Sequence, residues 1–341
     1  MKKVTLNDIA VKLNISKNTV SKALRGLPGV SDEMRKKIID LAREMGYTKG
    51  NISSSYSTNA KPININLICR KSFFDEPTFW SHVFYGIWNF SGKNNISIRT
   101  VTVEPATENS PSTISSILNT NCHGYLIVGT ISDEVLRKIV ATQAPVVVVD
   151  YYNRDIECDY INSANDNGIY KAIKYLYSKN HKKIGFINNA EGAYTFNERY
   201  NAFIKYMQLF NLPINDYFIW HDATYINTDY YIEKFNKLHN LPDFPTAWVC
   251  VNDNTALTFY KALQILGIKV PEEISIIGFD NISISNVYDP FLTTIDVPQI
   301  AMGQLAIQQL LYRIDHPHEP FLNIELNTRL IERKSVKNLN D

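Results

Sequence analysis

The stretch VTLNDIAVKLNISKNTVSKALRG, residues 4–26, decides the fold of the amino-terminal region. Thr5 and Asp8 have the spacing of a capping box at a helix start, and Ser16 can cap a second helix. Asn14 can adopt the left-handed conformation that ends the first helix. Apolar residues follow each cap at helical spacing: Leu6, Ile9, Ala10 and Leu13, then Val20, Ala23 and Leu24. The pattern predicts two short helices joined by a tight turn.

A third helical pattern begins after Gly26, Pro28 and Gly29 interrupt the chain. Ser31 has the position of its cap, and Gly46 ends it. Its apolar stripe consists of Met34, Ile38, Leu41, Ala42 and Met45. Three short helices can share one small core, so the second helix needs few large apolar residues of its own.

The outward face of the second helix is polar and basic. Lys17 and Asn18 lie in its first turn, and Lys22 is four residues after Asn18 on the same face. In a helix-turn-helix, the second helix presents its first turns to base edges in the major groove of DNA. Asn pairs with adenine and Lys reaches guanine, whereas Thr19 and Ser21 suit phosphate oxygens. A solvated polar face without a partner is the alternative that spacing alone leaves open.

The net charge of +1 hides an uneven distribution along the chain. Residues 1–60 hold 11 Lys and Arg against 5 Asp and Glu, a net charge of +6, and the remainder holds 24 against 29, a net charge of −5. The length of 341 residues, with 45% hydrophobic and 20% charged, is typical of a globular protein with two or three domains. A basic head on a mildly acidic body predicts that only the head meets a polyanion.

Several classes of protein are not expected from the sequence. No apolar run reaches about 18 residues, and Asp8 and Lys12 interrupt the amino terminus, so neither a membrane span nor a signal peptide is predicted. The four cysteines have no metal-ligand spacing and predict reduced thiols in a cytoplasmic protein. No catalytic motif, phosphate loop or ligand-spaced histidine cluster occurs. We therefore expect no enzyme activity, no cofactor and no metal site.

From residue 63 onward, β-branched runs alternate with helical patterns. The expected strands lie in INLICRK, ISIRTVTV, GYLIVGT, PVVVVDYY, KIGFI, YFIWH, AWVCV, ISIIGFD and FLNIELNTRLIERKS. The expected helices occupy residues 79–93, 113–121, 133–142, 165–178, 197–210, 229–238, 255–266 and 300–314. Two sets of such repeats predict two doubly wound parallel sheets, in which ligands bind beyond the carboxyl ends of the strands. A ligand-binding cleft between two lobes is therefore expected.

Polar side chains stand at the carboxyl ends of the predicted strands. Asp150 follows the fourth strand, Asn252 follows AWVCV and Asp280 ends ISIIGFD. Carboxylates and amides at these positions suit bidentate hydrogen bonds to sugar hydroxyls. Asp253 is expected to cap the helix that follows it.

Three aromatic residues, Phe73, Phe79 and Trp80, lie in or beside the first strand-to-helix loop. Their rings can stack on the face of a sugar in the cleft. Packing of the two lobes is the alternative, because the chain is rich in Tyr and Phe throughout.

The head resembles the DNA-binding headpiece of the LacI/GalR family of bacterial transcription regulators. Residues 4–26 and the stretch PGVSDEMRKKIIDLAREMGY, residues 28–47, are similar to the family signature almost position for position. The resemblance implies that Lys17, Asn18 and Lys22 read bases. It also implies phosphate contacts by Thr5, Asn7, Ser16, Thr19 and Ser21.

The linker TKGNISSSYSTNAKP, residues 48–62, departs from the family pattern. In the family this position carries a hinge helix that orders on DNA and wedges a leucine into the minor groove. Here Ser53 and Ser54 stand where Ala-Arg is usual, and Tyr56 stands where the leucine is usual. Serines are poorer helix formers than Ala and Arg. We expect a weak hinge helix in which Tyr56 inserts or stacks, with a plain flexible tether as the alternative.

The body, residues 63–336, resembles the effector domain of the same family, which is akin to periplasmic sugar-binding proteins. The stretches NDNTAL, PFLTTIDVP, RLIERKSV and above all VPEEISIIGFDN carry the resemblance. It implies that an effector is contacted by Asp150, Arg199, Asn252 and Asp280. A surface ion pair for Arg199 and a purely structural role for Asp280 are the alternatives. Ala164 replaces an aspartate of the family pattern, so the usual cap on the next helix is in doubt.

Together these features predict an all-α helix-turn-helix head and an α/β periplasmic-binding-protein-like body of two doubly wound parallel-sheet lobes. The predicted segments are a head (1–47), a hinge or linker (48–62), the body (63–336) and a tail (337–341), with the lobes exchanging near 162–165 and 290–298. We predict a repressor that binds a near-palindromic DNA operator as a homodimer and responds to a sugar or sugar derivative between the lobes. The alternatives are a regulator whose corepressor is a phosphorylated carrier protein, a solute-binding protein and a sugar-modifying enzyme.

Overall fold

The computed structural model describes residues 4–24, 30–45, 47, 62–75, 78–118, 120–189, 193–224, 227–286 and 291–340. The chain forms two compact units, the head (Met1–Lys61) and the body (Pro62–Asp341). Tyr56 and the rest of the predicted hinge up to residue 61 lie outside the described residues, so the role proposed for Tyr56 stays a prediction.

The described part of the head contains the helices α1 (Leu6–Lys12), α2 (Lys17–Leu24) and α3 (Asp32–Glu44). Thr5 and Asp8 form the predicted capping box, in which the Thr5 backbone N–H donates to Asp8 Oδ2 at 2.7 Å. Asn14 has the predicted left-handed backbone, with a φ of 53°. The buried core joins all of these helices and consists of Ile9, Ala10, Val20, Ala23, Leu24, Ile38, Ile39, Ala42 and Tyr47.

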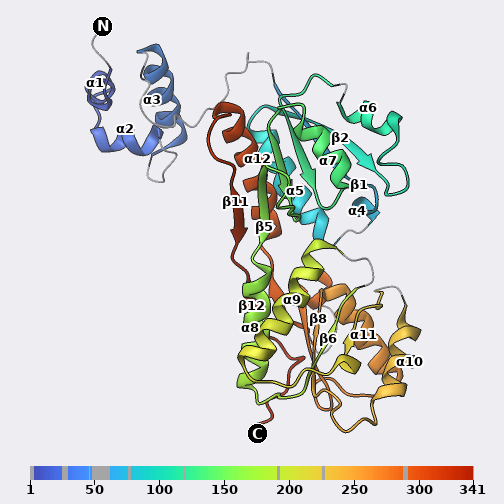
Figure 1. Ribbon diagram of the computed structural model, residues 1–341. Coiled ribbons are helices and arrows are strands. Elements are labelled where there is room, and N and C mark those ends of the chain that lie inside the picture. Colours follow the sequence, from blue (N-terminus) through green and yellow to red (C-terminus); the bar gives the residue numbers. More distant parts are fainter. Residues whose placement is uncertain are drawn as a thin grey trace. The chain divides into compact units, whose positions relative to one another are not determined.

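The amino lobe of the body is built on a parallel sheet with the strand order β11-β5-β4-β3-β1-β2 (Figure 1). Its strands are β1 (Ile63–Arg70), β2 (Ile96–Val103), β3 (Gly124–Val128), β4 (Val146–Val149), β5 (Asp159–Ser163) and β11 (Asn323–Leu326). Its helices are α4 (Ser72–Asp75), α5 (Phe79–Lys93), α6 (Pro111–Leu118), α7 (Asp133–Val140) and α12 (Gln299–Asp315). β3 and β4 are buried along their whole length, as expected of central parallel strands.

The carboxyl lobe has a second sheet with the order β12-β10-β9-β8-β6-β7, in which only the pairing of β12 with β10 is antiparallel. Its strands are β6 (Ile184–Ile187), β7 (Ile219–Trp220), β8 (Ala247–Cys250), β9 (Ser275–Asp280), β10 (Thr293–Asp296) and β12 (Arg329–Ile331). Its helices are α8 (Asn165–Ser178), α9 (Tyr194–Leu209), η1 (Asp216–Phe218), α10 (Thr228–Leu238), α11 (Asp253–Ile265) and η2 (Ser283–Asn286). The described residues thus form the two doubly wound lobes that the sequence predicts.

The described chain passes between the lobes after β5, after β10 and again between β11 and β12. The second passage leads into α12, which packs closely on α5 of the amino lobe. A Cβ atom on Gly86 of α5 would lie only 2.2 Å from the Ile300 carbonyl oxygen, and one on Gly303 of α12 would lie 2.1 Å from the Val83 carbonyl oxygen. Glycine at both positions therefore permits this close helix pairing. The third passage is not evident from the sequence pattern.

Two strands of the body, β5 and β10, were not expected from the apolar pattern. Both carry buried polar residues whose partners come from distant parts of the chain. Asp159 of β5 accepts two hydrogen bonds from Arg313 of α12, at 2.8 and 2.9 Å. Thr294 of β10 donates to Asp253 Oδ1 at 2.6 Å. These tertiary pairings replace the apolar signal by which a buried strand is ordinarily recognised.

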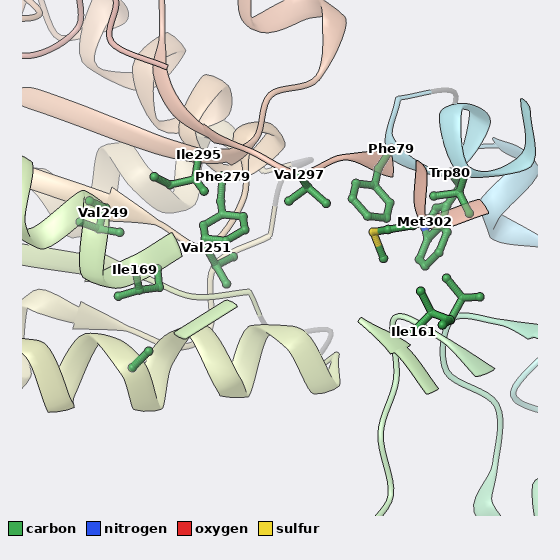
Figure 2. Close-up of a cluster of buried hydrophobic side chains, with 14 of the residues drawn as sticks. Phe79, Trp80, Ile161, Ile169, Val249, Val251, Phe279, Ile295, Val297 and Met302 are labelled. Carbon is green, nitrogen blue, oxygen red and sulfur yellow. The ribbon is translucent and has the colours of Figure 1, made fainter. Parts of the chain in front are cut away.

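One apolar core cluster contains residues of both lobes. Figure 2 shows it running from Ile169 and Phe279 in the carboxyl lobe, past Val297, to Phe79 and Trp80 in the amino lobe. The lobes are therefore joined by packed side chains as well as by the crossing segments.

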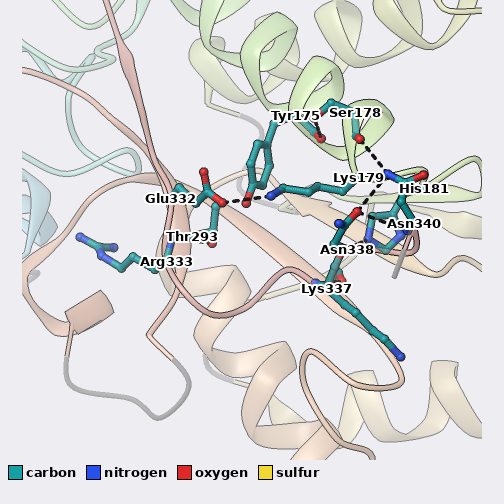
Figure 3. A network of polar contacts seen from close by, with 11 residues as sticks. Tyr175, Ser178, Lys179, His181, Thr293, Glu332, Arg333, Lys337, Asn338 and Asn340 are labelled. Carbon is teal, nitrogen blue, oxygen red and sulfur yellow. Dashed lines mark hydrogen bonds and ion pairs between the residues drawn. The ribbon is translucent and has the colours of Figure 1, made fainter.

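The carboxyl-terminal residues lie against the carboxyl lobe (Figure 3). Lys179 Nζ is 3.2 Å from Glu332 Oε1, and the buried His181 donates from Nε2 to the Lys337 carbonyl oxygen at 3.1 Å. Burial lowers the pKa of His181, which favours the neutral ring that this arrangement uses. Residues 337–340 of the expected tail are thus tied to the end of α8 by hydrogen bonds.

Candidate functional site

The outer face of α2 carries the residues predicted to read DNA bases. Lys17 and Asn18 are exposed, and Lys22 is partly buried on the next turn. The opposite face is closed by Val20 and Ala23, whose side chains have no exposed surface. The inner face of α2 therefore packs, and the outer face is available to another molecule.

The residues predicted to contact phosphates lie mostly at helix starts. Ser16 caps α2, because the Thr19 backbone N–H donates to Ser16 Oγ at 3.0 Å. Thr5 caps α1 in the same way. Asn7 is exposed, and Ser21 is partly buried. These side chains belong to α1, α2 and the residues that cap them. Their contacts with DNA stay predictions.

The body holds a cavity of about 100 Å³ where the two lobes meet. Its lining consists of Phe73, Phe79, Trp80, Gly129, Thr130, Asp150, Ala193, Thr195, Phe196, Arg199, Asn252 and Asp280. All seven residues that the sequence nominated for effector contact are in this lining.

The polar lining residues come from the carboxyl ends of parallel strands, as expected. Asp150 follows β4, Asn252 follows β8 and Asp280 is the last residue of β9. Asp150 and Asp280 both have positive φ angles, 59° and 106°. Residues other than glycine held in this region are uncommon and cluster at binding and catalytic sites.

Arg199 of α9 is buried and is held by the protein through all three of its side-chain nitrogens. Nε donates to Asn165 Oδ1 at 2.9 Å, and Nη1 donates to the Val251 carbonyl oxygen at 2.8 Å. Nη2 lies 3.1 Å from Asp280 Oδ1, and the guanidinium stacks on the Phe279 ring at 3.8 Å. The predicted alternative of a surface ion pair is wrong, since Arg199 is 1% exposed.

Asp150 is the least compensated charge of the cavity. Its side chain is 9% exposed, and its Oδ1 atom has no hydrogen-bond partner among the described residues. Burial raises the pKa of Asp150 to about 6, the positive charge of Arg199 lowers it, and the negative charge of Glu198 raises it further. The carboxylate therefore lacks a donor that a bound ligand can supply.

The three aromatic residues Phe73, Phe79 and Trp80 pack against one another, and their stacking on a ligand stays a prediction. Phe73 and Trp80 stack with ring centroids 4.2 Å apart, and Phe79 meets Trp80 edge-on at 5.0 Å. Phe79 and Trp80 belong to the core cluster that joins the lobes (Figure 2). All three rings line the cavity. The rings thus pack the lobes and offer an apolar surface to a ligand.

The helix cap predicted for Asp253 is formed by its neighbour instead. Asn252 is the cap of α11, since its Oδ1 accepts from the Thr255 backbone N–H at 2.9 Å. Asp253 is fully buried and accepts from Thr294 Oγ1 and from the Ile282 backbone N–H. The prediction for Asp253 is wrong because these two donors come from segments distant in the chain. Ala164 gives α8 no side-chain cap, as its replacement of aspartate suggested.

Five lining residues escaped the sequence reasoning: Gly129, Thr130, Ala193, Thr195 and Phe196. Gly129 and Thr130 directly follow β3, so the strand-end rule that found Asp150 also applied to them. Thr195 and Phe196 lie in the first turn of α9, which begins at Tyr194, three residues before the helix start that the sequence suggested. Their place on the cavity had no comparable signal.

No group of three or more His, Cys, Asp and Glu side chains in the described chain could hold a metal ion. The described helices include none that is both long enough and apolar enough to cross a membrane. Cys69, Cys158 and Cys250 are free and buried, and Cys122 is free and partly buried.

Comparison with known proteins agrees with the architecture of both units. A family model described as bacterial regulatory proteins, lacI family, matches residues 5–49, and one described as a periplasmic binding protein-like domain matches residues 173–336. The HTH-type transcriptional repressor PurR of Pasteurella multocida is 29% identical, over 98% of each chain. The ribose operon repressor of Haemophilus influenzae is 25% identical, over 98% of this chain and 99% of its own length.

Solved structures show the same fold. The lac repressor dimer bound to operator and the anti-inducer ONPF has a TM-score of 0.71 at 20% identity, covering 98% of this chain and 100% of that chain. A LacI family regulator from Enterococcus faecium with bound ribose has a TM-score of 0.68 at 23% identity, covering 81% and 99%. The chain thus combines a domain similar to the lacI family of bacterial regulatory proteins with a periplasmic binding protein-like domain. The two relatives named above carry the names of repressors, which agrees with the prediction of a regulator.

Proposed function

We propose that this protein is a transcriptional repressor that binds a near-palindromic operator as a homodimer and is controlled by a small ligand between its lobes. The observation that carries the proposal is the presence of two complementary sites in one chain. The head exposes Lys17 and Asn18 on a helix whose other face is packed, and the body encloses a cavity lined by both lobes. Relatives that match nearly the full chain are named as repressors.

A pair of heads is needed to read two half-sites of a near-palindrome. The body offers an exposed aromatic face on which two copies can associate. Tyr85 and Trp88 of α5 are 56% and 45% exposed, and Phe74 of α4 is 43% exposed. Phe74 and Trp88 both stack against the buried Phe84, so these two exposed rings belong to one aromatic cluster. Contiguous exposed apolar surface of this kind marks interaction sites, which supports a homodimer through the amino lobes.

Control by a ligand follows from the position of the cavity. A ligand there touches Trp80 and Asp150 of the amino lobe and Arg199 and Asp280 of the carboxyl lobe. It therefore stabilises one arrangement of the lobes over others, and this difference is what shifts operator affinity. A sugar or sugar derivative fits the combination of stacked rings and hydrogen-bonding groups. A neutral nucleobase or nucleoside is a second candidate, because the Phe73–Trp80 stack suits a flat ring as well.

Two alternatives make different demands on the body. A phosphorylated carrier protein as corepressor would act on the outer surface of the lobes and leave the cavity without a role. A solute-binding protein would use the cavity and leave the reading face of α2 without one. Only a ligand-controlled regulator uses both sites, which is why we favour it.

The DNA-binding half of the proposal is tested at Asn18. An operator selected from random duplexes serves as the probe, and fluorescence anisotropy of the full-length protein at physiological salt gives its affinity. Asn18→Ala is expected to lose about 1–3 kcal/mol of discrimination for each half-site, because one base contact disappears. Lys17→Ala should relax specificity in the same way.

Lys37→Ala is the matched control, since it removes one positive charge from α3, where Lys37 pairs with Glu33 at 2.8 Å. It should weaken binding to all sequences alike or leave binding unchanged. Intact sequence-specific binding by both Lys17→Ala and Asn18→Ala would refute the assignment of the reading face.

A further inference from the structure

The charge balance of the cavity sets a condition on its ligand. Among the described lining residues, Arg199 is the single cation, and Asp150 and Asp280 are carboxylates. The guanidinium is already committed to Asp280, at 3.1 Å, and to two neutral acceptors of the protein. Its charge is therefore largely offset before any ligand arrives, and the negative charge of Asp150 is left over.

The surroundings of Asp150 reinforce this negative charge. Glu198, the neighbour of Arg199 on α9, acts on Asp150 as a second negative charge. Glu198 itself accepts from Tyr194 Oη at 2.6 Å and from Asn165 Nδ2 at 3.3 Å, and no described cation forms an ion pair with it. Arg199 is the cation that acts on Asp150, and it already forms an ion pair with Asp280, so little positive charge is left for an anionic ligand beside Asp150.

The described cation next to the lining is Arg70, and it too is already held by the protein. Its Nε donates to the Thr130 carbonyl oxygen at 2.7 Å, and its Nη2 lies 4.0 Å from Glu108 Oε1. Its charge is therefore shared with a carboxylate of the protein, as the charge of Arg199 is.

Hydrogen-bonding capacity points the same way. Asp150 Oδ1 is buried without a partner among the described residues, so a hydroxyl or amino group of a ligand can donate to it. Asn252 uses its Oδ1 to cap α11, which leaves its amino group as the donor it can present. The stacked Phe73 and Trp80 rings complete a site with one apolar wall and a carboxylate facing the ligand.

We propose that this cavity accepts uncharged or positively charged ligands rich in hydroxyl or amino groups, and that Asp150 makes it reject phosphorylated and carboxylated ones. The inference rests on the proposed function, because it specifies the ligand class of the same site. An anion beside Asp150 meets a like charge in a buried setting, where charges are poorly screened. A hydroxyl or ammonium group instead satisfies the lone Oδ1 atom.

The test compares matched ligands on the full-length protein. The panel contains neutral hexoses and pentoses with their amino, phosphate and uronic or aldonic acid derivatives, and nucleosides with their monophosphates. Binding is followed by protein fluorescence, since Trp80 lines the cavity, and by the shift in thermal unfolding. The tightest-binding neutral or amino compound is expected to bind at least tenfold more tightly than its anionic counterpart.

Asp150→Asn assigns the selectivity to one charge, because it keeps the shape of the side chain and Asn also tolerates a positive φ. We expect this variant to reduce the ratio of the affinities for a neutral compound and for its anionic counterpart about tenfold. Glu134→Gln, on the exposed face of α7, removes a carboxylate outside the cavity lining and should leave the ratio unchanged.

Three results would overturn the inference: an anionic compound that binds as tightly as its neutral parent, a ratio unaffected by Asp150→Asn, or a panel in which no neutral or amino compound binds. Operator affinity is measured separately on the same samples. A ligand that shows the expected charge preference but leaves operator affinity unchanged would contradict ligand control and leave the charge preference standing.

Discussion

The two walls of the cavity are built from different kinds of side chain. The amino lobe contributes the rings of Phe73, Phe79 and Trp80, which hold one another by stacking and edge contacts. The carboxyl lobe contributes Arg199 and Asp280, which are fixed by an ion pair and hydrogen bonds. The amino wall is therefore held by ring packing, and the carboxyl wall by an ion pair with its hydrogen bonds.

Asp150 is the exception to this division, because it lies on the amino wall and is charged. Its pKa is raised by burial, and no described side chain donates a hydrogen bond to its Oδ1 atom. The amino lobe therefore presents an unsatisfied charge where the carboxyl lobe presents a satisfied pair. Single substitutions on each wall test this difference in charge compensation.

The largest effect on stability is expected from removing the cation of the carboxyl wall. Arg199→Ala leaves Asp280 buried without its cation and should lower the free energy of unfolding of the body by about 3–5 kcal/mol. Lys205→Ala on the same helix breaks an exposed ion pair with Asp166 and should cost at most about 1 kcal/mol. Urea unfolding of both variants measures the comparison. Equal costs would mean that the Arg199 network is no more important than a surface pair.

A smaller and opposite effect on stability is expected from removing the charge of Asp150. The pKa of Asp150 is raised from 3.8 to about 6, so the folded protein binds more protons than the unfolded chain between these values. The contribution of Asp150 to stability is therefore full below pH 4 and is lost as the pH rises through 6. Two pKa units correspond to about 3 kcal/mol. Asp150→Asn should thus be more stable than the wild type at pH 7.5, by up to about 3 kcal/mol.

The check on Asp150→Asn is its unfolding in urea at pH 4 and at pH 7.5. The difference from the wild type should shrink toward zero at pH 4, where the carboxyl group is protonated in the folded protein. A variant less stable than the wild type at pH 7.5 would show that the folded protein stabilises the ionised carboxylate of Asp150.

The smallest effect on stability is expected from a substitution next to the rings of the amino wall. Gly129 and Gly267 both have positive φ angles, 72° and 76°, so alanine is strained at either position. A Cβ atom on Gly129 would also lie 2.3 Å from the Phe73 ring, whereas one on Gly267 meets nothing within 4 Å. Gly129→Ala should therefore cost about 1–3 kcal/mol more than Gly267→Ala and should weaken ligand binding by shifting Phe73. Equal stability and equal ligand affinity of the two variants would show that the Phe73 ring can move away from the added methyl group without cost.

Much of the candidate site could be predicted because its signals are local. Asp150, Asn252 and Asp280 were found from their place after β-branched runs, since parallel strands bring their carboxyl ends to one edge. The same rule applies to Thr130, which lies two residues after the end of β3. Asp253 was misjudged for a physical reason: two neighbouring residues can each cap α11, and Thr294 and Ile282 decide between them from outside the local sequence.

The sequence by itself determined the helices and caps of the head, the alternation of strands and helices in the body, and the residue types at the strand ends. These features depend on interactions within a few residues, such as capping, periodicity and turn formation. Only the tertiary structure decided that Arg199 is buried between Asn165, Val251 and Asp280, and that Asp150 Oδ1 has no donor among the described residues. Those outcomes depend on which distant groups meet and on how far they exclude water, and neither is written in any short stretch of the chain.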